Sequence, residues 1–187
     1  LHKASDILDN IAGKDESSKS RRKNMFDFFK KKKAPEGYKM TAAADGKVIP
    51  MSEAKDPVFS SCALGNGVVI QPTGEVVVAP AAGTVTVTMD DSNHAVGLEL
   101  EGGIEILIHI GVDTVELKGE GFESYIKNGD KVEAGAKLIH FDREALEAKG
   151  YCMEVMQIVM EGDKSAGVSY QTGMDAVAGE TVVAEWK

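Results

Sequence analysis

The amino-acid sequence predicts an all-β fold, a closed sandwich or barrel. Two observations predict it. Short runs rich in valine, isoleucine and threonine recur after Tyr38, and this composition is typical of strands. Clusters of glycine, proline and asparagine separate the runs at short intervals, and many short strands with turns between them indicate a sandwich or a barrel.

The expected elements follow in chain order. Strands are expected at 68–70, 76–79, 84–88, 96–100, 104–110, 137–141, 155–160 and 181–186. Turns are expected between them at 65–67, 80–83, 101–103 and 128–130. One short helix is expected over 143–149, because Asp142 can cap its first turn and Gly150 follows its last residue.

The strand at 104–110 carries the most informative residue. Side chains alternate along a strand, so the isoleucines at its even positions face one side. Glu105, Leu107 and His109 face the other side. His109 is therefore expected off the core face, next to a glycine-containing turn, where an imidazole can act as a nucleophile.

Charge and composition exclude several classes of function. The net charge is −9, and the acidic residues are concentrated after Tyr38, which argues against nucleic acid as the main partner and for a basic protein partner. Cys62 and Cys152 lie far apart without a C-x-x-C motif, so neither a disulfide framework nor a structural zinc site is expected. No apolar run approaches transmembrane length. We expect a cytoplasmic protein.

The segment before Tyr38 is expected to be a leader. Residues 13–24 are too polar to offset the entropy of ordering, so residues 1–37 are interpreted as a disordered leader or linker and residues 38–187 as the domain. Phe26–Lys33, with three phenylalanines and four lysines, could make weak contact with an anionic membrane surface, or could be a solvated linker. Translation is hypothesised to begin at Met25.

Two segments, 79–85 and 129–138, resemble the turns of lipoyl- and biotin-carrier domains, whose fold is a barrel-sandwich. Such carriers present a modifiable lysine on an exposed hairpin. The stretch after the second segment reads Ile139-His140-Phe141-Asp142-Arg143 and has no such lysine. A swinging-arm carrier is therefore disfavoured.

A more specific resemblance extends from about Ala42 to Asp142. Its segments are 44–52, 56–59, 65–72, 78–80 and 105–122, and the last contains LIHIGVDTV at 107–115 and KGEGF at 118–122. These segments resemble the glucose-family enzyme IIA of the bacterial phosphotransferase system. The resemblance implies an antiparallel β-sandwich of the barrel-sandwich hybrid type and a phosphoryl group relayed on histidine, with no cofactor. It also implies two partners, the phosphocarrier HPr as donor and a cysteine on the IIB domain of a sugar permease as acceptor.

The same resemblance assigns roles at the site. His109 matches the phospho-acceptor, as a tele-phosphohistidine, and His94 matches the second family histidine, which would donate a ring N–H to the phosphoryl oxygens. Ser92 stands where the family commonly has threonine and keeps the hydroxyl. Asp56 and Asp113 align with family carboxylates, which could shape the partner contact or repel a misplaced phosphate; as ordinary surface acids they would have no role. His2 and His140 match no family site.

Apolar residues near the site are candidates for protein docking. Val58 and Phe59 match a family docking patch, and Leu107 shares the face of His109. An exposed apolar patch rimmed with acids suits transient binding of several partners. The alternative is that these side chains belong to the core.

The alternative function is that of a zinc peptidase of the lysostaphin type. Its H-x-x-x-D element is formally matched by His109 and Asp113. Such enzymes also need a later H-x-H pair, and after His109 the chain has only His140, so this function is disfavoured. No metal is required, although His94 and His109 could bind zinc opportunistically. A regulatory role through docking to other proteins is compatible with the phosphocarrier interpretation.

Overall fold

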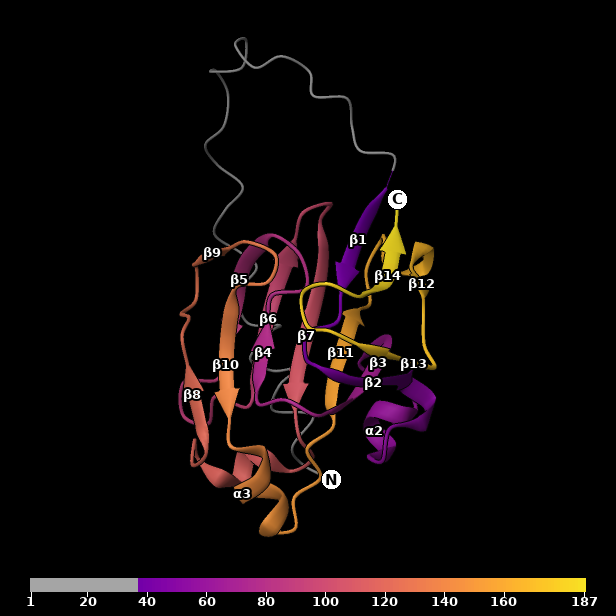
Figure 1. Cartoon of the computed structure of the whole chain (residues 1–187). Coiled ribbons are helices and arrows are strands. Elements are labelled where there is room, and N and C mark those ends of the chain that lie inside the picture. The colour runs from indigo at the N-terminus through magenta and orange to yellow at the C-terminus, as the bar shows by residue number, and fades with distance from the viewer. Residues whose placement is uncertain (1–36) are drawn as a thin grey trace. The chain divides into compact units, whose positions relative to one another are not determined.

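The computed structural model describes residues 37–187, in which fourteen strands form three sheets. Every strand pair is antiparallel. The expectations for a disordered leader, for a start at Met25 and for membrane contact through Phe26–Lys33 lie outside these residues. Figure 1 shows the arrangement of the strands.

The largest sheet has eight strands. Their order is β13 (Met174–Ala176), β2 (Gly46–Pro50), β3 (Gly65–Pro72), β11 (Val155–Met160), β7 (Ile104–Ile110), β6 (Ala95–Leu100), β5 (Gly83–Thr88) and β9 (Lys131–Val132). One smaller sheet has the order β1 (Tyr38–Thr41), β14 (Val182–Trp186) and β12 (Ser169–Tyr170). The other has the order β4 (Val76–Val78), β10 (Lys137–Phe141) and β8 (Phe122–Ser124).

The helical segments are short. The 3₁₀ turns are η1 (Met51–Glu53), η2 (Thr114–Leu117) and η3 (Ser165–Gly167), and the α-helices are α2 (Pro57–Ser60) and α3 (Arg143–Ala148). The expected cap of α3 is confirmed, because the Asp142 side chain accepts a hydrogen bond from the Ala145 N–H at 3.0 Å.

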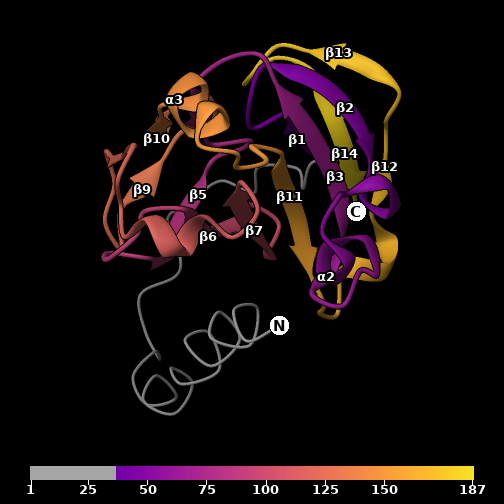
Figure 2. The same cartoon turned by 90° about the horizontal axis from the view of Figure 1, so that it is seen from below.

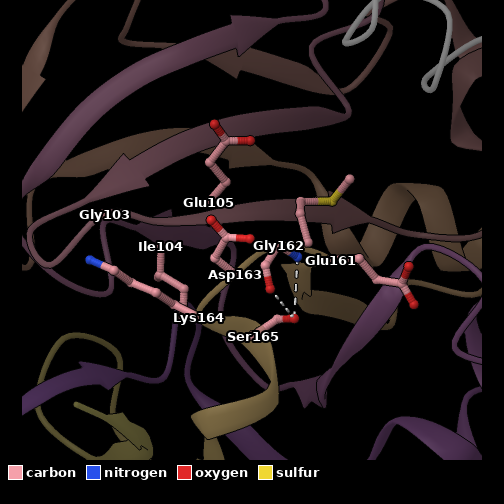
Figure 3. Close-up of a pocket in the computed structure, with 9 residues that line it drawn as sticks. Gly103, Ile104, Glu105, Glu161, Gly162, Asp163, Lys164 and Ser165 are labelled. Atoms are coloured by element: carbon pink, nitrogen blue, oxygen red, sulfur yellow. Dashed lines mark hydrogen bonds between the residues drawn. The ribbon is translucent and has the colours of Figure 1, made fainter.

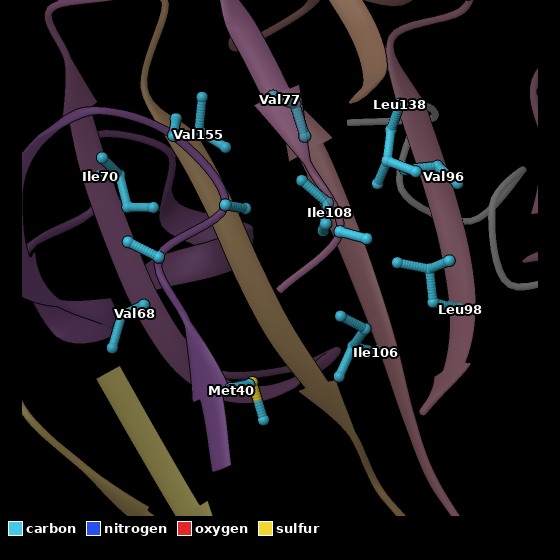
Figure 4. Close-up of a cluster of buried hydrophobic side chains, with 14 of the residues drawn as sticks. Met40, Val68, Ile70, Val77, Val96, Leu98, Ile106, Ile108, Leu138 and Val155 are labelled. Atoms are coloured by element: carbon cyan, nitrogen blue, oxygen red, sulfur yellow. The ribbon is translucent and has the colours of Figure 1, made fainter. Parts of the chain in front are cut away.

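The main core lies between one face of the eight-stranded sheet and the two smaller sheets. It contains the even-numbered isoleucines of β7 together with side chains of β1, β4 and β10 (Figure 4). Because alternate residues of β7 enter this core, His109 and Leu107 must lie on the opposite face. The predicted all-β sandwich, and the predicted direction of His109, are therefore confirmed.

A second apolar layer forms on that opposite face. Register across the sheet places Ile49, Val69, Met156, His109 and Ala95 in one row over β2, β3, β11, β7 and β6. The segment 51–61, which contains η1 and α2, lies on the β2–β3–β11 side of the molecule (Figure 2). It brings Phe59 onto this face, since the Phe59 ring packs on His109. His109 is thus the polar member of an otherwise apolar row.

Candidate active site

Two histidines from neighbouring strands meet at one end of the large sheet. His109 is the next-to-last residue of β7, and His94 immediately precedes β6. The His94 carbonyl accepts a hydrogen bond from the Ile110 N–H at 2.8 Å, so the strand ladder fixes the two backbones side by side. The ring centroids lie 4.8 Å apart with an interplanar angle of 83°. The structure therefore brings together the two histidines that the sequence singled out.

His109 is held in an apolar setting. Its side chain is only 6% exposed, and the Phe59 ring packs on it at a centroid distance of 4.9 Å. Burial, together with the smaller effect of the neighbouring His94, lowers the pKa of His109 to about 3, against an opposing hydrogen bond with the Gly111 backbone. Nδ1 is buried without a hydrogen bond of good geometry. The ring is therefore neutral at cellular pH.

The turn after His109 depends on a glycine. Gly111 has φ +77°, and a Cβ atom there would lie 2.4 Å from Cγ2 of Thr114. The Gly111 N–H donates to the Glu154 carbonyl at 2.8 Å, and the buried Thr114 hydroxyl donates to the Ile110 carbonyl at 2.5 Å. The chain can turn away directly after His109 because this position carries no side chain.

His94 is oriented by a serine. Its Nδ1 lies 2.6 Å from Oγ of Ser92, and both side chains are buried. Asn93 between them adopts φ 52°, a left-handed conformation that asparagine tolerates. Burial lowers the pKa of His94 to about 4. This imidazole is therefore also neutral at cellular pH, with one nitrogen engaged by Ser92.

The two candidate carboxylates occupy turns near the site. Asp56 is the N-cap of α2, and its Oδ1 accepts a hydrogen bond from the Val58 N–H at 2.6 Å. Asp113 is exposed and adopts φ 60° at the start of η2, four residues after His109. The sequence did not predict the capping role of Asp56, although the Asp-Pro pair before Val58 is a helix-start signal.

The expected docking patch is smaller than the sequence indicated. Leu107 was expected to be part of it, but its side chain is fully buried at 0% exposure under the apolar layer, so a partner cannot contact it directly. Phe59 is only 6% exposed, and it contacts His109. Val58 is partly exposed. The sequence could not predict which of these three side chains are exposed, because their exposure depends on how the 51–61 segment folds over the sheet.

A metal centre with several ligands is not present among the described residues. No group of three or more His, Cys, Asp and Glu side chains in residues 37–187 is arranged to hold a metal ion. The pair of imidazoles therefore lacks the further ligand that the H-x-x-x-D interpretation expected from Asp113. In the same residues, no helix is long and apolar enough to cross a membrane.

A pocket of about 400 Å³ lies elsewhere, where β7 begins and β11 ends (Figure 3). Its charged lining consists of Glu105, Glu161, Asp163 and Lys164. The Lys164 ammonium donates to the Gly102 carbonyl. The histidines lie at the other end of β7, so this pocket does not belong to their site.

Comparison with known proteins places the chain in a family. Residues 38–165 match the family described as phosphoenolpyruvate-dependent sugar phosphotransferase system, EIIA 1. This match covers more than half of the chain. The chain belongs to this family. The resemblance inferred from the motifs around His94 and His109 is confirmed.

Individual EIIA relatives support the same conclusion. The chain is 38% identical over 144 residues to the glucose-specific EIIA component of Bacillus anthracis, covering 77% of this chain and 87% of that protein. It is 41% identical over 144 residues to the glucose-specific EIIBCA component of Corynebacterium glutamicum, covering 77% of this chain and 21% of that protein. The chain thus spans about a fifth of the length of this multidomain relative.

A solved EIIA structure has the same fold. Glucose permease IIA from Mycoplasma capricolum matches with a TM-score of 0.71 and 33% sequence identity, over 86% of this chain and 99% of that one. The chain therefore contains an EIIA domain of the sugar phosphotransferase system, the part that serves as a phosphocarrier in sugar uptake. The zinc-peptidase alternative is not supported.

Proposed function

We propose that His109 is the phospho-acceptor and that its Nε2 carries the phosphoryl group. The observation that carries this proposal is a neutral imidazole at the end of β7 with a second imidazole 4.8 Å away, edge to face. Nδ1 of His109 is buried, which leaves Nε2 as the nitrogen for attack. A neutral ring has a free lone pair, which a protonated ring lacks.

The reaction exchanges one P–N bond for another. The lone pair of His109 Nε2 attacks the phosphorus of phosphohistidine on the donor, the donor P–N bond breaks, and its electron pair returns to the donor imidazole. The onward step forms a P–S bond to a thiolate and releases the His109 ring. Such transfers through a loose transition state need in-line positioning and stabilisation of the equatorial oxygens more than covalent chemistry.

His94 supplies that stabilisation in this proposal. A hydroxyl can donate to an imidazole nitrogen, so the Ser92 Oγ–H donates to Nδ1 across 2.6 Å and leaves the ring proton on Nε2. Nε2–H is then a fixed donor for a phosphoryl oxygen on His109. Asp56 and Asp113 are assigned to the rim of the site, where negative charge guides a basic donor and repels phosphate in the wrong place.

The proposed partners are phospho-HPr as donor and a cysteine of a IIB domain as acceptor. Relatives named EIIBCA and EIICBA support the second partner, because their names join an EIIA part to EIIB and EIIC parts in one protein. Val58 contributes partly exposed apolar surface to the docking contact. The functional domain is assigned to residues 38–187, since β1 pairs with β14 near the C-terminus. Its location is assigned to the cytoplasm.

The test is phosphorylation with purified enzyme I, HPr and phosphoenolpyruvate. One acid-labile, base-stable phosphate per chain is expected, and peptide mapping is expected to place it on His109. His109→Ala is expected to abolish labelling, while His140→Ala, a control histidine on β10, is expected to label like the unmodified chain. A label on His94, or normal labelling of His109→Ala, would overturn the assignment.

A further inference from the structure

Glu154 is a buried acid beside the histidine site that the phosphotransfer mechanism does not use. Its side chain is only 4% exposed. Oε2 accepts a hydrogen bond from the Lys55 N–H at 3.0 Å, while Oε1 is buried without a partner. Burying an acceptor without a partner costs about 1–3 kcal/mol. Buried acceptors without a partner are rare in native folds, so each of them needs a physical explanation.

The backbone of Glu154 supports the turn after His109. The Glu154 carbonyl accepts the Gly111 N–H at 2.8 Å, and Met156, two residues later on β11, lies opposite His109 in the strand register. Side chains two residues apart share one face of a strand, so the Glu154 side chain extends over the face that carries His109. Its bond to Lys55, in the segment that covers this face, agrees with that direction.

The hydrogen bond from the Lys55 N–H to Glu154 anchors the segment that carries Phe59. Within residues 37–187, it is the one hydrogen bond that joins the segment 51–61 to β11 or its flanking residues. The segment's other hydrogen bonds lie within it, such as the Val58 N–H to Asp56 Oδ1, or join it to the adjacent Cys62, whose N–H donates to the Phe59 carbonyl. Lys55 is followed at once by the N-cap of α2, and Phe59 is the buried residue of that helix.

We propose that Glu154 is a positioning residue for the phospho-acceptor, holding the 54–59 segment so that the Phe59 ring covers His109. Its carbonyl binds the turn that follows His109, and its carboxylate binds the segment that carries Phe59. This inference rests on the proposed role of His109 as acceptor. The group required is an acceptor at Oε2, which glutamine also provides and alanine does not.

The test follows the His109 ring by NMR in the unphosphorylated full chain. Glu154→Ala is expected to loosen the 54–59 segment and to let water reach His109. The pKa of His109 is then expected to rise by about one unit or more, because desolvation is the largest cause of the lowered pKa. Glu154→Gln is expected to restore the low pKa, since its amide oxygen can accept the Lys55 N–H. Phe59→Ala is expected to raise the pKa as Glu154→Ala does, and the double variant to add little.

Gln157, on the strand β11 that begins directly after Glu154, offers a matched control. It is also a buried polar side chain, but it bonds to the Ala43 N–H and the Thr41 carbonyl, away from the 51–61 segment. Gln157→Ala is expected to lower the melting temperature and leave the His109 pKa unchanged. An unchanged His109 pKa in Glu154→Ala, a shift of equal size in Gln157→Ala, or no rescue by glutamine would each overturn the proposal.

Phosphotransfer assays separate this inference from the proposed function. If the unmodified chain fails to accept phosphate on His109, the proposed function fails, and the NMR titration still decides whether Glu154 sets the environment of the ring. If the chain accepts phosphate, Glu154→Ala is expected to be phosphorylated by phospho-HPr several-fold more slowly than Glu154→Gln. Equal rates for the two variants would overturn the positioning role.

Discussion

The ring of His94 stands nearly perpendicular to the ring of His109, at an interplanar angle of 83°. In this arrangement the edge of one ring faces the plane of the other, whereas parallel stacking would cover both ring faces. His94 also opposes the protonation of His109, since it lowers the pKa of His109. The pair is therefore held in a state with two neutral rings, one suited to attack and one suited to donate a proton in a hydrogen bond.

The first prediction concerns pH. Burial lowers the pKa of His94 to about 4, and burial together with His94 lowers that of His109 to about 3, so neither ring is expected to titrate between pH 8 and pH 5.5. The unfolded chain titrates near 6.5. As pH falls, the histidines of the unfolded chain therefore take up protons before those of the folded chain. The free energy of unfolding is expected to fall as pH drops below about 6.5. NMR titration and urea unfolding at several pH values measure the two effects.

Carboxylates also protonate in the acid part of this range, so the pH prediction needs a matched variant. His94→Gln with His109→Gln removes both titrating groups and keeps polar side chains of similar size. The difference in stability between the two proteins is expected to change between pH 7 and pH 5, in the direction that disfavours the histidine form at low pH. A constant difference would show that the rings are hydrated and titrate normally.

The second prediction concerns the tautomer of His94. Ser92→Ala leaves the buried Nδ1 without its partner at 2.6 Å, so the ring proton is no longer confined to Nε2. Transfer from phosphorylated chain to a IIB domain is expected to slow about three- to tenfold, the value of one hydrogen bond. Ser92→Thr keeps the hydroxyl and is expected to retain the rate. Equal rates for the alanine and threonine variants would contradict the proposed orientation.

Local pattern was enough to predict much of the fold. The segments 104–110, 137–141 and 155–160 form β7, β10 and β11 with the expected bounds, because each is a run of β-formers bounded by turn signals or polar residues. Strands of two or three residues, such as β9 and β12, are too short to show a periodicity. They are defined by pairing with distant strands, which local sequence does not encode.

At the site, too, local sequence predicts some features, and contacts between distant segments determine the others. The alternation of side chains along 104–110 predicted the direction of His109. The packing of Phe59 on His109 depends on how the 51–61 segment folds over the sheet, and is therefore a tertiary property. Glu154 gave no signal, because a lone glutamate before a strand is usually exposed. Sequence therefore predicts the direction of His109 better than it predicts the residues that surround this side chain.

The third prediction separates docking from packing. Leu107→Ala removes a fully buried side chain and is expected to lower the free energy of unfolding by about 2–5 kcal/mol, with little change in KM for phospho-HPr. Val58→Ala, at a partly exposed position, is expected to raise that KM several-fold at a smaller cost in stability. Urea unfolding and initial-rate kinetics measure these effects. The opposite pattern would mean that Leu107 is reached by the partner.

The fourth prediction tests the turn after His109. Gly111→Ala combines a positive φ with a Cβ atom 2.4 Å from Thr114 Cγ2, and is expected to destabilise the fold by more than about 2 kcal/mol and to slow phosphorylation. Gly150→Ala is the matched control, since its φ is +91° with no atom within 4 Å of the added Cβ. Gly150→Ala is expected to lower the free energy of unfolding by about 1–2 kcal/mol, the cost of the positive φ alone, and to be phosphorylated normally. Equal losses would indicate that the contact with Thr114 relaxes freely.

The last prediction follows from the edge-to-face pair. A phosphoryl group on Nε2 of His109 places about two negative charges beside His94, and an adjacent negative charge favours the protonated ring. The pKa of His94 is therefore expected to rise from about 4 on phosphorylation, opposite to the lowering that burial produces in the free protein. NMR titration of the phosphorylated chain above pH 6, where the P–N bond persists, measures this shift, and phosphorylated Ser92→Thr serves as the control that keeps the Nδ1 contact. A His94 pKa that does not change on phosphorylation would place the phosphoryl oxygens out of reach of this ring, and the stabilising donor would then have to come from the partner protein.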